Sequence, residues 1–293
     1  MTTPAITISE LTKHYGDKRA VDGLDLEIEQ GEVFALLGPN GAGKSTTIEI
    51  LEGFRKRTSG DVTVLGIDPH QGDRDWRTHI GVMLQSTSER SSLSAREALT
   101  HTSRLYPNPR DVEETLRAVG LTDKANAKPQ TLSGGQRRRL DVALAVVGRP
   151  QLVFLDEPTT GFDPEARRKF WGLIEALKGD GTTIMLTTHY LDEAEHLADR
   201  IGIVAAGKLI ALDTPAKLRA RAAGSLVQWE ERGETQSEST TTPTALVKTL
   251  AERFDGEVPE LSITKPSLED VYLDLIGQQA DAQDVATHTG ASS

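Results

Sequence analysis

The feature that most constrains this fold is a glycine-rich run that directly follows a short apolar segment. Val33–Leu37 is continuously apolar, as expected of a strand that is buried on both faces. Residues 38–46 follow it at once, and Lys44–Leu51 has the pattern of a helix that is closed by Gly53. Residues 38–45 fit the spacing G-x-x-x-x-G-K-[ST], and strand, loop and helix are the context that a phosphate-binding loop requires. The same context disfavours a glycine-rich turn that contains a lysine by chance.

The chemistry of this phosphate loop (residues 38–46) predicts a bound nucleotide. Its backbone amides lie at a helix N-terminus, where they can cradle phosphates. Lys44 would reach the β and γ phosphates, and Ser45 would ligate Mg²⁺. The candidate nucleotide-binding residues of the loop are Gly38, Pro39, Asn40, Gly41, Ala42, Gly43, Lys44, Ser45 and Thr46.

Two carboxylates follow a second apolar run, at residues 152–155. Asp156 ends this predicted buried strand, where a carboxylate can complete a Mg²⁺ shell. Glu157 would point elsewhere, because successive strand residues alternate faces, and it can polarise the water that attacks the γ phosphate. The alternative is an Asp-Glu pair that only caps the strand before Pro158. The phosphate loop upstream favours the functional interpretation.

Further candidates stand at predicted strand ends, and each has a structural alternative. His189 follows Thr187-Thr188 and could donate a hydrogen bond to the γ phosphate, although a lone histidine is usually structural. Gln85 follows an apolar run and could touch the metal or the attacking water; otherwise it is a solvated strand end. Tyr15 could stack on a purine ring, but a strand tyrosine packed in the core fits the spacing almost as well. The catalytic candidates are Glu157, His189 and Lys44, and the metal-ligand candidates are Ser45, Gln85 and Asp156.

A second phosphate-binding surface is indicated far downstream, at residues 132–136, which read Leu-Ser-Gly-Gly-Gln. Two glycines after a serine leave backbone N–H groups uncovered beside a hydroxyl. The candidate ligands are Ser133, Gly134, Gly135 and Gln136. The arginines at residues 137–139 are interpreted as a solvated helix face with one or two contacts at the edge of the core.

Composition narrows the class of protein. A chain of 293 residues has room for one large domain and a small one. Its formal net charge of -11 argues against a protein that wraps nucleic acid, and the absence of cysteine fits a cytosolic protein. No apolar stretch approaches the roughly 18 residues that a membrane span needs, and no signal peptide is expected at the start. Any association with a membrane would then come through a partner.

Periodicity predicts two α/β domains. Residues 1–215 would hold a mixed core sheet with an antiparallel β portion and a mainly helical segment at residues 86–148. In that segment, helices are expected from a capping box at Ser94 and Glu97 to near Pro107, and over residues 111–119 and 135–147. Residues 216–277 would form a small α/β appendage that includes a loop or weakly ordered hairpin at 229–243, and residues 278–293 a disordered tail.

These motifs together resemble the ATP-binding cassette (ABC) family, and the resemblance covers residues 5 to about 215. The family's motifs occur here in order: an aromatic residue (Tyr15), Walker A (residues 38–45), the Gln loop (Gln85), the signature (residues 132–136), Walker B (residues 152–156) with its glutamate (Glu157), the D-loop (residues 161–163) and the switch histidine (His189). Phe162 stands where leucine is more usual. Residues 187–195 and 266–272 look like the subfamily that serves type-2 ABC exporters, which includes drug-resistance ATPases of the daunorubicin type.

The resemblance implies a P-loop ATPase, with ATP and Mg²⁺ as ligands, that is coupled to transport. It also implies that the signature closes over the nucleotide of a second, head-to-tail subunit in a homodimer, so that Ser133 and Gly135 would contact a γ phosphate held by the partner's Lys44. A separate transmembrane permease would dock near residues 85–94, at Gln85 to Ser94, and hold the chain at the cytoplasmic face of the cell membrane. The expected cargo is a drug, an antibiotic or another hydrophobic compound, with no nucleic-acid partner and no direct membrane insertion.

Two rival functions are considered. A soluble ABC ATPase that acts on DNA or ribosomes would need long coiled-coil heptads, zinc-binding cysteines or a second cassette, and the sequence holds none of them. A P-loop kinase or GTPase outside this family does not account for residues 132–136.

Overall fold

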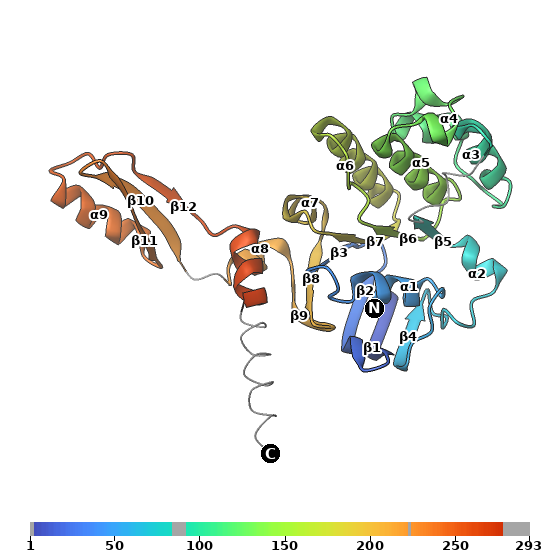
Figure 1. Cartoon of the computed structure of the whole chain (residues 1–293), viewed down its shortest axis with the longest axis horizontal. Coiled ribbons are helices and arrows are strands. Elements are labelled where there is room, and N and C mark those ends of the chain that lie inside the picture. The colour runs from blue at the N-terminus through green and yellow to red at the C-terminus, as the bar shows by residue number, and fades with distance from the viewer. Residues whose placement is uncertain (1–2, 84–91, 222–223, 278–293) are drawn as a thin grey trace, which may run out of the picture. The chain divides into compact units, whose positions relative to one another are not determined.

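The computed structural model describes residues 3–83, 92–221 and 224–277, and the chain divides into two compact units, Met1–Leu212 and Asp213–Ser293. Within the described ranges, no helix has both the length and the apolar character that crossing a membrane demands. The first unit is mixed α/β, as predicted, and the second is smaller (Figure 1).

The centre of the first unit is a six-stranded sheet in the order β5-β6-β7-β3-β8-β9. Here β3 (Val33–Leu37) lies parallel to both of its neighbours, β7 (Thr183–Thr188) and β8 (Arg200–Ala205). Beyond β7, β6 (Leu152–Asp156) and β5 (Ile80–Met83) continue the parallel pairing. Every residue of β3, β6 and β7 is buried, which accounts for the apolar runs at residues 33–37 and 152–155 in the first two strands. Because the strands are parallel, their carboxyl ends meet at one edge, where ligands bind in open α/β sheets.

A second, antiparallel sheet has the order β2-β1-β4, built from β2 (Lys18–Glu29), β1 (Pro4–Tyr15) and β4 (Ser59–Val64). The register that pairs Ile6 with Ile28 and Ile8 with Leu26 brings the alternating apolar residues to one buried face. Helix α1 (Lys44–Leu51) contacts β2, β4 and β6, so it joins this sheet to the central one. The predicted antiparallel portion is confirmed.

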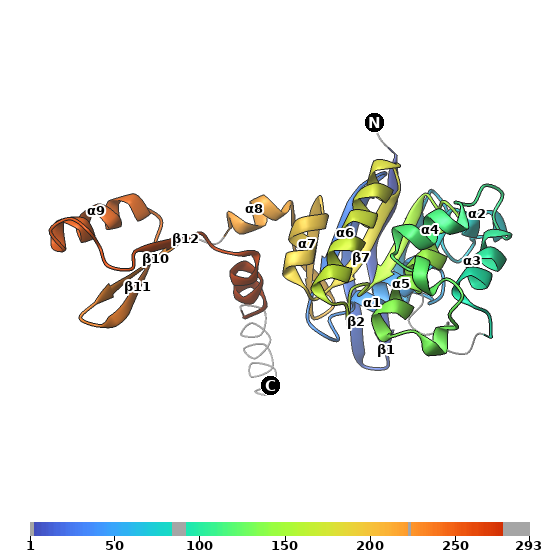
Figure 2. The ribbon, with the colours of Figure 1, turned by 90° about the horizontal axis from the view of Figure 1, so that it is seen from above.

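The described part of the predicted helical segment contains the α-helices α3 (Ala95–Ser103), α4 (Val112–Ala118) and α5 (Gly134–Val146) and two short 3₁₀ helices. The α-helices contact one another and gather at one end of the unit (Figure 2). The capping box at Ser94 and Glu97 is confirmed. Helix α3 ends at Ser103, short of the predicted end near Pro107, because the amides of Leu105 and Tyr106 turn back to i−3 carbonyls.

Other elements of the unit were only partly predicted. An Asp-Pro pair favours a helix start, and Asp163 caps α6 (Pro164–Gly179) by accepting a hydrogen bond from the Ala166 amide at 2.8 Å. The apolar runs at residues 201–205 and 209–212 flank an Ala-Gly pair, a pattern that favours a hairpin, and β8 and β9 (Lys208–Asp213) form one whose two-residue turn has positive φ at both positions. The short helices α2 (Arg74–Thr78) and α7 (Leu191–Leu197) and strand β4 were not predicted.

The second unit begins with α8 (Pro215–Arg219) and contains a three-stranded antiparallel sheet in the order β11-β10-β12. The polar segment predicted as a loop or weak hairpin is a hairpin, made by β10 (Ser225–Glu231) and β11 (Glu234–Thr240). Helix α9 (Pro243–Arg253) and β12 (Ser262–Thr264) follow, and residues 268–277 are helical. The core of this unit is small and consists of Val227, Trp229, Leu250 and Val258. The predicted tail at residues 278–293 lies outside the described residues.

Candidate functional site

The phosphate loop runs from the carboxyl end of β3 to α1, and two of its glycines, Gly38 and Gly43, are required by close backbone approaches. A Cβ atom on Gly38 would lie 2.3 Å from the carbonyl oxygen of Val204. A Cβ atom on Gly43 would lie 2.3 Å from the carbonyl oxygen of Ala20, and Gly43 has a φ of +105°. Such contacts leave no room for a side chain. The loop is therefore fixed by the chain's own core before any ligand arrives.

Lys44 is held inside this loop. Its side chain is buried, and Nζ donates hydrogen bonds to the carbonyl oxygens of Gly38 at 2.7 Å and Pro39 at 3.2 Å. Burial lowers the pKa of Lys44, and the nearby charges of Glu157 and Asp156 oppose that shift. The ammonium group therefore lies where it can meet the charge of a phosphate group.

A cavity of about 200 Å³ opens over the loop. It is lined by Tyr15, Lys18, Ala20, Asn40, Gly41, Gly43, Lys44, Ser45, Thr46 and Glu157. Tyr15 is 41% exposed and the Arg55 guanidinium lies 5.4 Å from its ring centroid, so the alternative of a core tyrosine does not hold. Lys18 was not singled out from the sequence, because a basic residue at a strand start carries no signal of its own.

Asp156 and Glu157 face different cavities, but strand alternation is not the reason, because β6 ends at Asp156 and Glu157 has a positive φ of +48°. Asp156 lines a neighbouring cavity of about 490 Å³ together with Ser45, whereas Glu157 lines the cavity over the phosphate loop. Asp156 is buried and its carboxylate accepts a hydrogen bond from the Thr187 hydroxyl. A serine hydroxyl and a carboxylate on one wall are hard oxygen donors, so this donor set fits Mg²⁺.

Glu157 and His189 come together although they are far apart in the sequence. His189 Nδ1 lies 3.5 Å from Glu157 Oε2, and the Thr160 hydroxyl lies 3.4 Å from the same oxygen. The two residues follow adjacent parallel strands, β6 and β7, whose ends share one edge of the sheet. The tertiary structure thus places a carboxylate and an imidazole beside the cavity over the phosphate loop. Gln85, the remaining predicted ligand of this group, lies outside the described residues.

The signature run (residues 132–136) forms the start of α5. Ser133 is the N-cap: its hydroxyl accepts from the Gln136 amide at 3.2 Å, and the Gln136 side chain accepts from the Ser133 amide at 3.0 Å. Both polar side chains therefore serve as a capping box. No residue of the run lines either of the two cavities described above. The structure does not bring this run to the phosphate loop of its own chain.

The arginines that follow the run make the one or two core-edge contacts that the sequence suggests, and the structure identifies them. Arg138 donates to the carbonyl oxygens of Asp156 and, at 2.8 Å, of Glu157. Arg139 donates to the carbonyl oxygens of Val119 at 3.2 Å and Gly120 at 2.9 Å. Nothing in the sequence distinguishes these two side chains from a solvated arginine.

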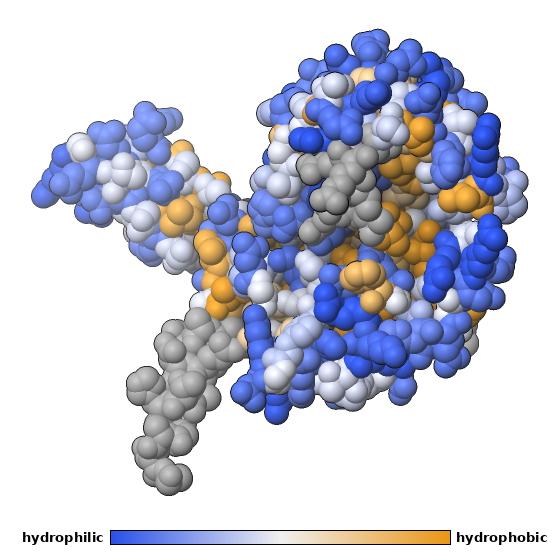
Figure 3. Space-filling model, turned by 45° about the vertical axis from the view of Figure 1, so that its right-hand side comes forward, coloured by the Kyte–Doolittle hydropathy of each residue, from blue (hydrophilic) through white to orange (hydrophobic). Residues whose placement is uncertain are grey.

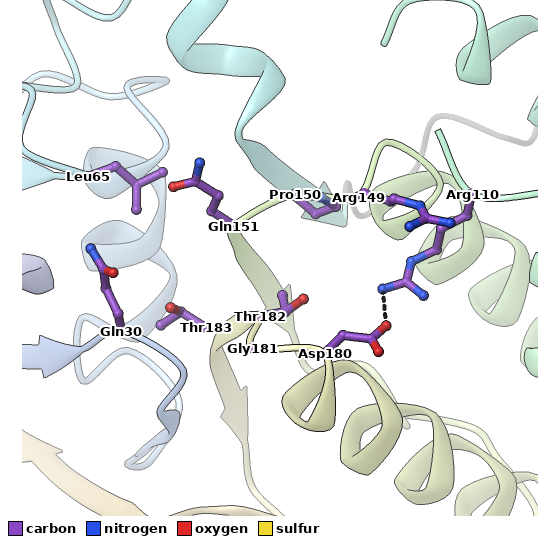
Figure 4. A pocket seen from close by; sticks show the side chains of 10 residues that line it. All are labelled: Gln30, Leu65, Arg110, Arg149, Pro150, Gln151, Asp180, Gly181, Thr182 and Thr183. Carbon is purple, nitrogen blue, oxygen red and sulfur yellow. Dashed lines mark hydrogen bonds and ion pairs between the residues drawn. The ribbon is translucent and has the colours of Figure 1, made fainter. Parts of the chain in front are cut away.

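A polar cavity of about 450 Å³ lies elsewhere (Figure 4). Its walls include Gln151 and Thr183, at the amino ends of β6 and β7, and the Arg110–Asp180 ion pair, whose atoms are 2.8 Å apart. Because the strands are parallel, this edge of the sheet is opposite the one that carries the phosphate loop. The cavity is therefore not part of the candidate site.

Known proteins resemble the chain in both sequence and structure. Residues 21–160 match a family model described as "ABC transporter". The daunorubicin/doxorubicin resistance ATP-binding protein DrrA of Streptomyces peucetius is 39% identical, with 95% of this chain and 94% of that protein covered. The Nod factor export ATP-binding protein I of Rhizobium meliloti is 42% identical over 72% of this chain and 64% of its own length. A dimeric ATP-binding cassette in a post-hydrolysis state, bound to ADP and Pi, superposes with a TM-score of 0.65 at 27% identity, covering 71% of this chain and 98% of the cassette.

Proposed function

The chain belongs to the ABC transporter family, and from that premise we propose that it is the ATP-hydrolysing subunit of an exporter whose channel is a separate membrane protein. The observation that carries the proposal is the similarity to the daunorubicin/doxorubicin resistance protein, which covers 95% of the chain and so includes the second unit. The rival function, an ATPase that acts on DNA or ribosomes, has no such support.

In the proposed ATPase, the phosphate loop binds the nucleotide. Its amides and Lys44 hold the β and γ phosphates, and the exposed ring of Tyr15 stacks on the purine. Ser45 and Asp156 would hold Mg²⁺, which when bound neutralises charge on the phosphate oxygens. The chain's own contribution is a cradle that is already shaped, so little conformational entropy is lost on binding.

Glu157 is proposed to act as the general base. Its carboxylate lines the cavity over the phosphate loop and can accept a proton from the attacking water. His189 is proposed to donate a hydrogen bond to the γ phosphate. When protonated, an imidazole donates from both nitrogens, so Nδ1 can face Glu157 while Nε2 faces the phosphate.

We further propose that the signature run acts on a second copy of the chain, arranged head to tail. Gly134 is exposed, and a Cβ atom added to it would have no atom within 4 Å. Its own subunit therefore sets no requirement for glycine at this helix start, in contrast to Gly38 and Gly43. In the proposed dimer, a nucleotide held by the partner's Lys44 would approach this backbone closely, and that approach would require glycine.

Mixed dimers test this arrangement. Lys44→Ala disables the phosphate loop of a subunit, and Gly134→Asp disables its signature run because a carboxylate repels phosphate. Each variant alone should hydrolyse ATP very slowly. Mixing them creates one dimer site with an intact loop and an intact signature run, so hydrolysis should return, as measured by phosphate release.

The matched control mixes Lys44→Ala with Glu157→Gln. Both changes lie on the phosphate-loop side, so each site of the mixed dimer keeps one defect and hydrolysis should stay low. Restoration in the control, or none in the first mixture, would contradict the head-to-tail assignment. The absence of ATPase activity in the wild-type chain would contradict the proposed function itself.

The permease is proposed to dock beside the second cavity, near residues 85–94. Most of that segment lies outside the described residues, but the cavity before it is lined by Val82 and Met83 and by Phe54, whose side chain is 78% exposed. Figure 3 shows hydrophobic residues gathered in a hollow of the first unit. An exposed apolar surface of this kind is typical of a protein interface. Phe54→Ser should weaken co-purification with the permease and leave ATP binding unchanged.

The proposed cargo is a hydrophobic drug-like compound, because the relative that is similar over both units is named for resistance to daunorubicin and doxorubicin. The test expresses the chain in a sensitive bacterium with the permease encoded by a neighbouring reading frame of about six spanning helices. Export of daunorubicin should exceed that of cells with the Glu157→Gln chain. Equal export would contradict this cargo while leaving the ATPase assignment intact.

A further inference from the structure

The backbone of Glu157 adopts a conformation that the residue does not prefer. Its φ is +48°, in the left-handed region that glycine and asparagine occupy more readily than glutamate. Residues held in such conformations are maintained by their surroundings and cluster at functional sites. The contacts that maintain Glu157 therefore bear on where its carboxylate points.

Two sets of contacts hold this backbone. On the amide side, the Glu157 N–H donates to the carbonyl and hydroxyl oxygens of Thr187, both at 3.1 Å. On the carbonyl side, the oxygen accepts from the Arg138 guanidinium at 2.8 Å and from the Thr160 amide at 3.3 Å. Arg138 also donates to the carbonyl oxygen of Asp156, so one guanidinium spans two successive carbonyls.

We propose that Arg138 is a positioning residue for ATP hydrolysis: it fixes the peptide of Glu157 so that the carboxylate faces the cavity over the phosphate loop. The proposal rests on the role proposed above for Glu157. A planar guanidinium can donate to two acceptors at once, and a charged donor makes a stronger hydrogen bond than a neutral one. Loss of this contact would let the Glu157 backbone adopt commoner conformations. The carboxylate would then turn away from the cavity over the phosphate loop.

The location of Arg138 adds a second consequence. It lies on α5, the helix that begins with the signature run. The same helix also approaches the segment after β6 at Gly135, where a Cβ atom would lie 3.3 Å from the Gly161 carbonyl oxygen. The position of the general base is thereby tied to the helix that carries the signature run of the same subunit.

Arg138→Gln and Arg138→Lys test the role, with Arg139→Gln as a matched control. Arg139 lies on the same helix and also donates to two carbonyl oxygens, but those belong to Val119 and Gly120. Arg138→Gln should lower kcat by at least about tenfold, because small misplacements of a catalytic group are costly, and leave the ATP dissociation constant within about twofold. Arg138→Lys should recover part of the loss, and Arg139→Gln should keep kcat near the wild-type value.

Mixed dimers separate positioning from a general structural defect. In the dimer of Gly134→Asp with Lys44→Ala, the working site uses Glu157 of the first subunit and the signature run of the second. Arg138→Gln should abolish most hydrolysis when added to the first subunit and little when added to the second.

Equal losses in both placements, or no loss in either, would overturn the positioning role. If Arg138→Gln prevents folding, the same two placements of Arg138→Lys decide the matter. A mixed dimer that is inactive before Arg138 is changed would instead contradict the proposed head-to-tail site, so the two failures are distinguishable.

Discussion

The phosphate loop and the signature run are both helix N-termini with glycines, yet the chain treats them differently. The loop is enclosed: its glycines touch the backbone of Val204 and Ala20, and a cavity opens over it. In the signature run Gly134 is exposed, a Cβ atom added to it would meet no atom within 4 Å, and neither of the two cavities beside the phosphate loop is lined by a residue of the run. Internal packing therefore explains Gly38 and Gly43, whereas the packing of the subunit does not explain Gly134, which the proposed approach of a second subunit would explain.

The largest effect is expected at Glu157, which lines the cavity over the phosphate loop. Glu157→Gln keeps the shape of the side chain but removes the carboxylate that is proposed to act as the general base, so hydrolysis should fall by roughly 10²–10⁴-fold while ATP still binds. Sizing chromatography with ATP should then show an accumulated dimer, because the bound nucleotide is not consumed. Turnover at the wild-type rate would refute the role of Glu157.

Alanine substitutions at Gly43 and Gly134 test the difference between the two helix N-termini directly. Gly43→Ala forces a contact with the Ala20 carbonyl and a positive φ on alanine, and should cost about 1–3 kcal/mol of folding stability and most nucleotide binding. Gly134→Ala adds a methyl group in open space, so thermal stability and nucleotide binding should be unchanged. Only the turnover of the dimer should fall. A drop in the stability of the Gly134→Ala monomer would break the distinction.

A smaller effect is expected at Tyr15, which is proposed to stack on the base of the nucleotide. Tyr15→Ala should weaken ATP binding by about tenfold, the order expected for loss of one stacked aromatic ring, and Tyr15→Phe should keep the affinity. Titration with a fluorescent ATP analogue measures both. Unchanged ATP binding in Tyr15→Ala would contradict the proposed stacking of the Tyr15 ring on the purine.

The smallest effect is expected at Glu52, the residue that follows α1. Burial, and then repulsion from Asp156 and Glu49, raises the pKa of Glu52 from 4.5 to about 8. A carboxyl group with a raised pKa in the folded state keeps a proton that the unfolded chain releases. The resulting loss of folding stability grows as the pH rises from 4.5 to about 8. Glu52→Gln should therefore raise Tm by a few degrees, about 2–4 °C, at pH 9 in metal-free buffer. At pH 4.5 and below the two proteins should melt together, and a gain in Tm that does not vary with pH would contradict the assignment.

Much of the fold was predictable because its strongest signals are local. The continuous apolar runs of β3 and β6, the glycine loop between β3 and α1, and the capping box of α3 each depend on residues close in sequence. Helix α7 was missed because its buried face includes Glu193, which breaks the apolar pattern. Strand β4 was missed because only Val62 and Val64 are buried in it, and α2 is too short for a periodicity to appear.

The amino-acid sequence alone predicts three features that bear on chemistry: a phosphate-binding loop, two carboxylates after a buried strand, and a serine with two glycines at a helix start. These follow from residue types and short spacings, which act through covalently neighbouring groups. Only the tertiary structure decided that Glu157 meets His189, that Tyr15 is exposed, and that Arg138 reaches the carbonyl of Glu157. Those contacts join segments that lie far apart in the sequence and meet only through strand order and helix packing. No local sequence pattern therefore predicts them.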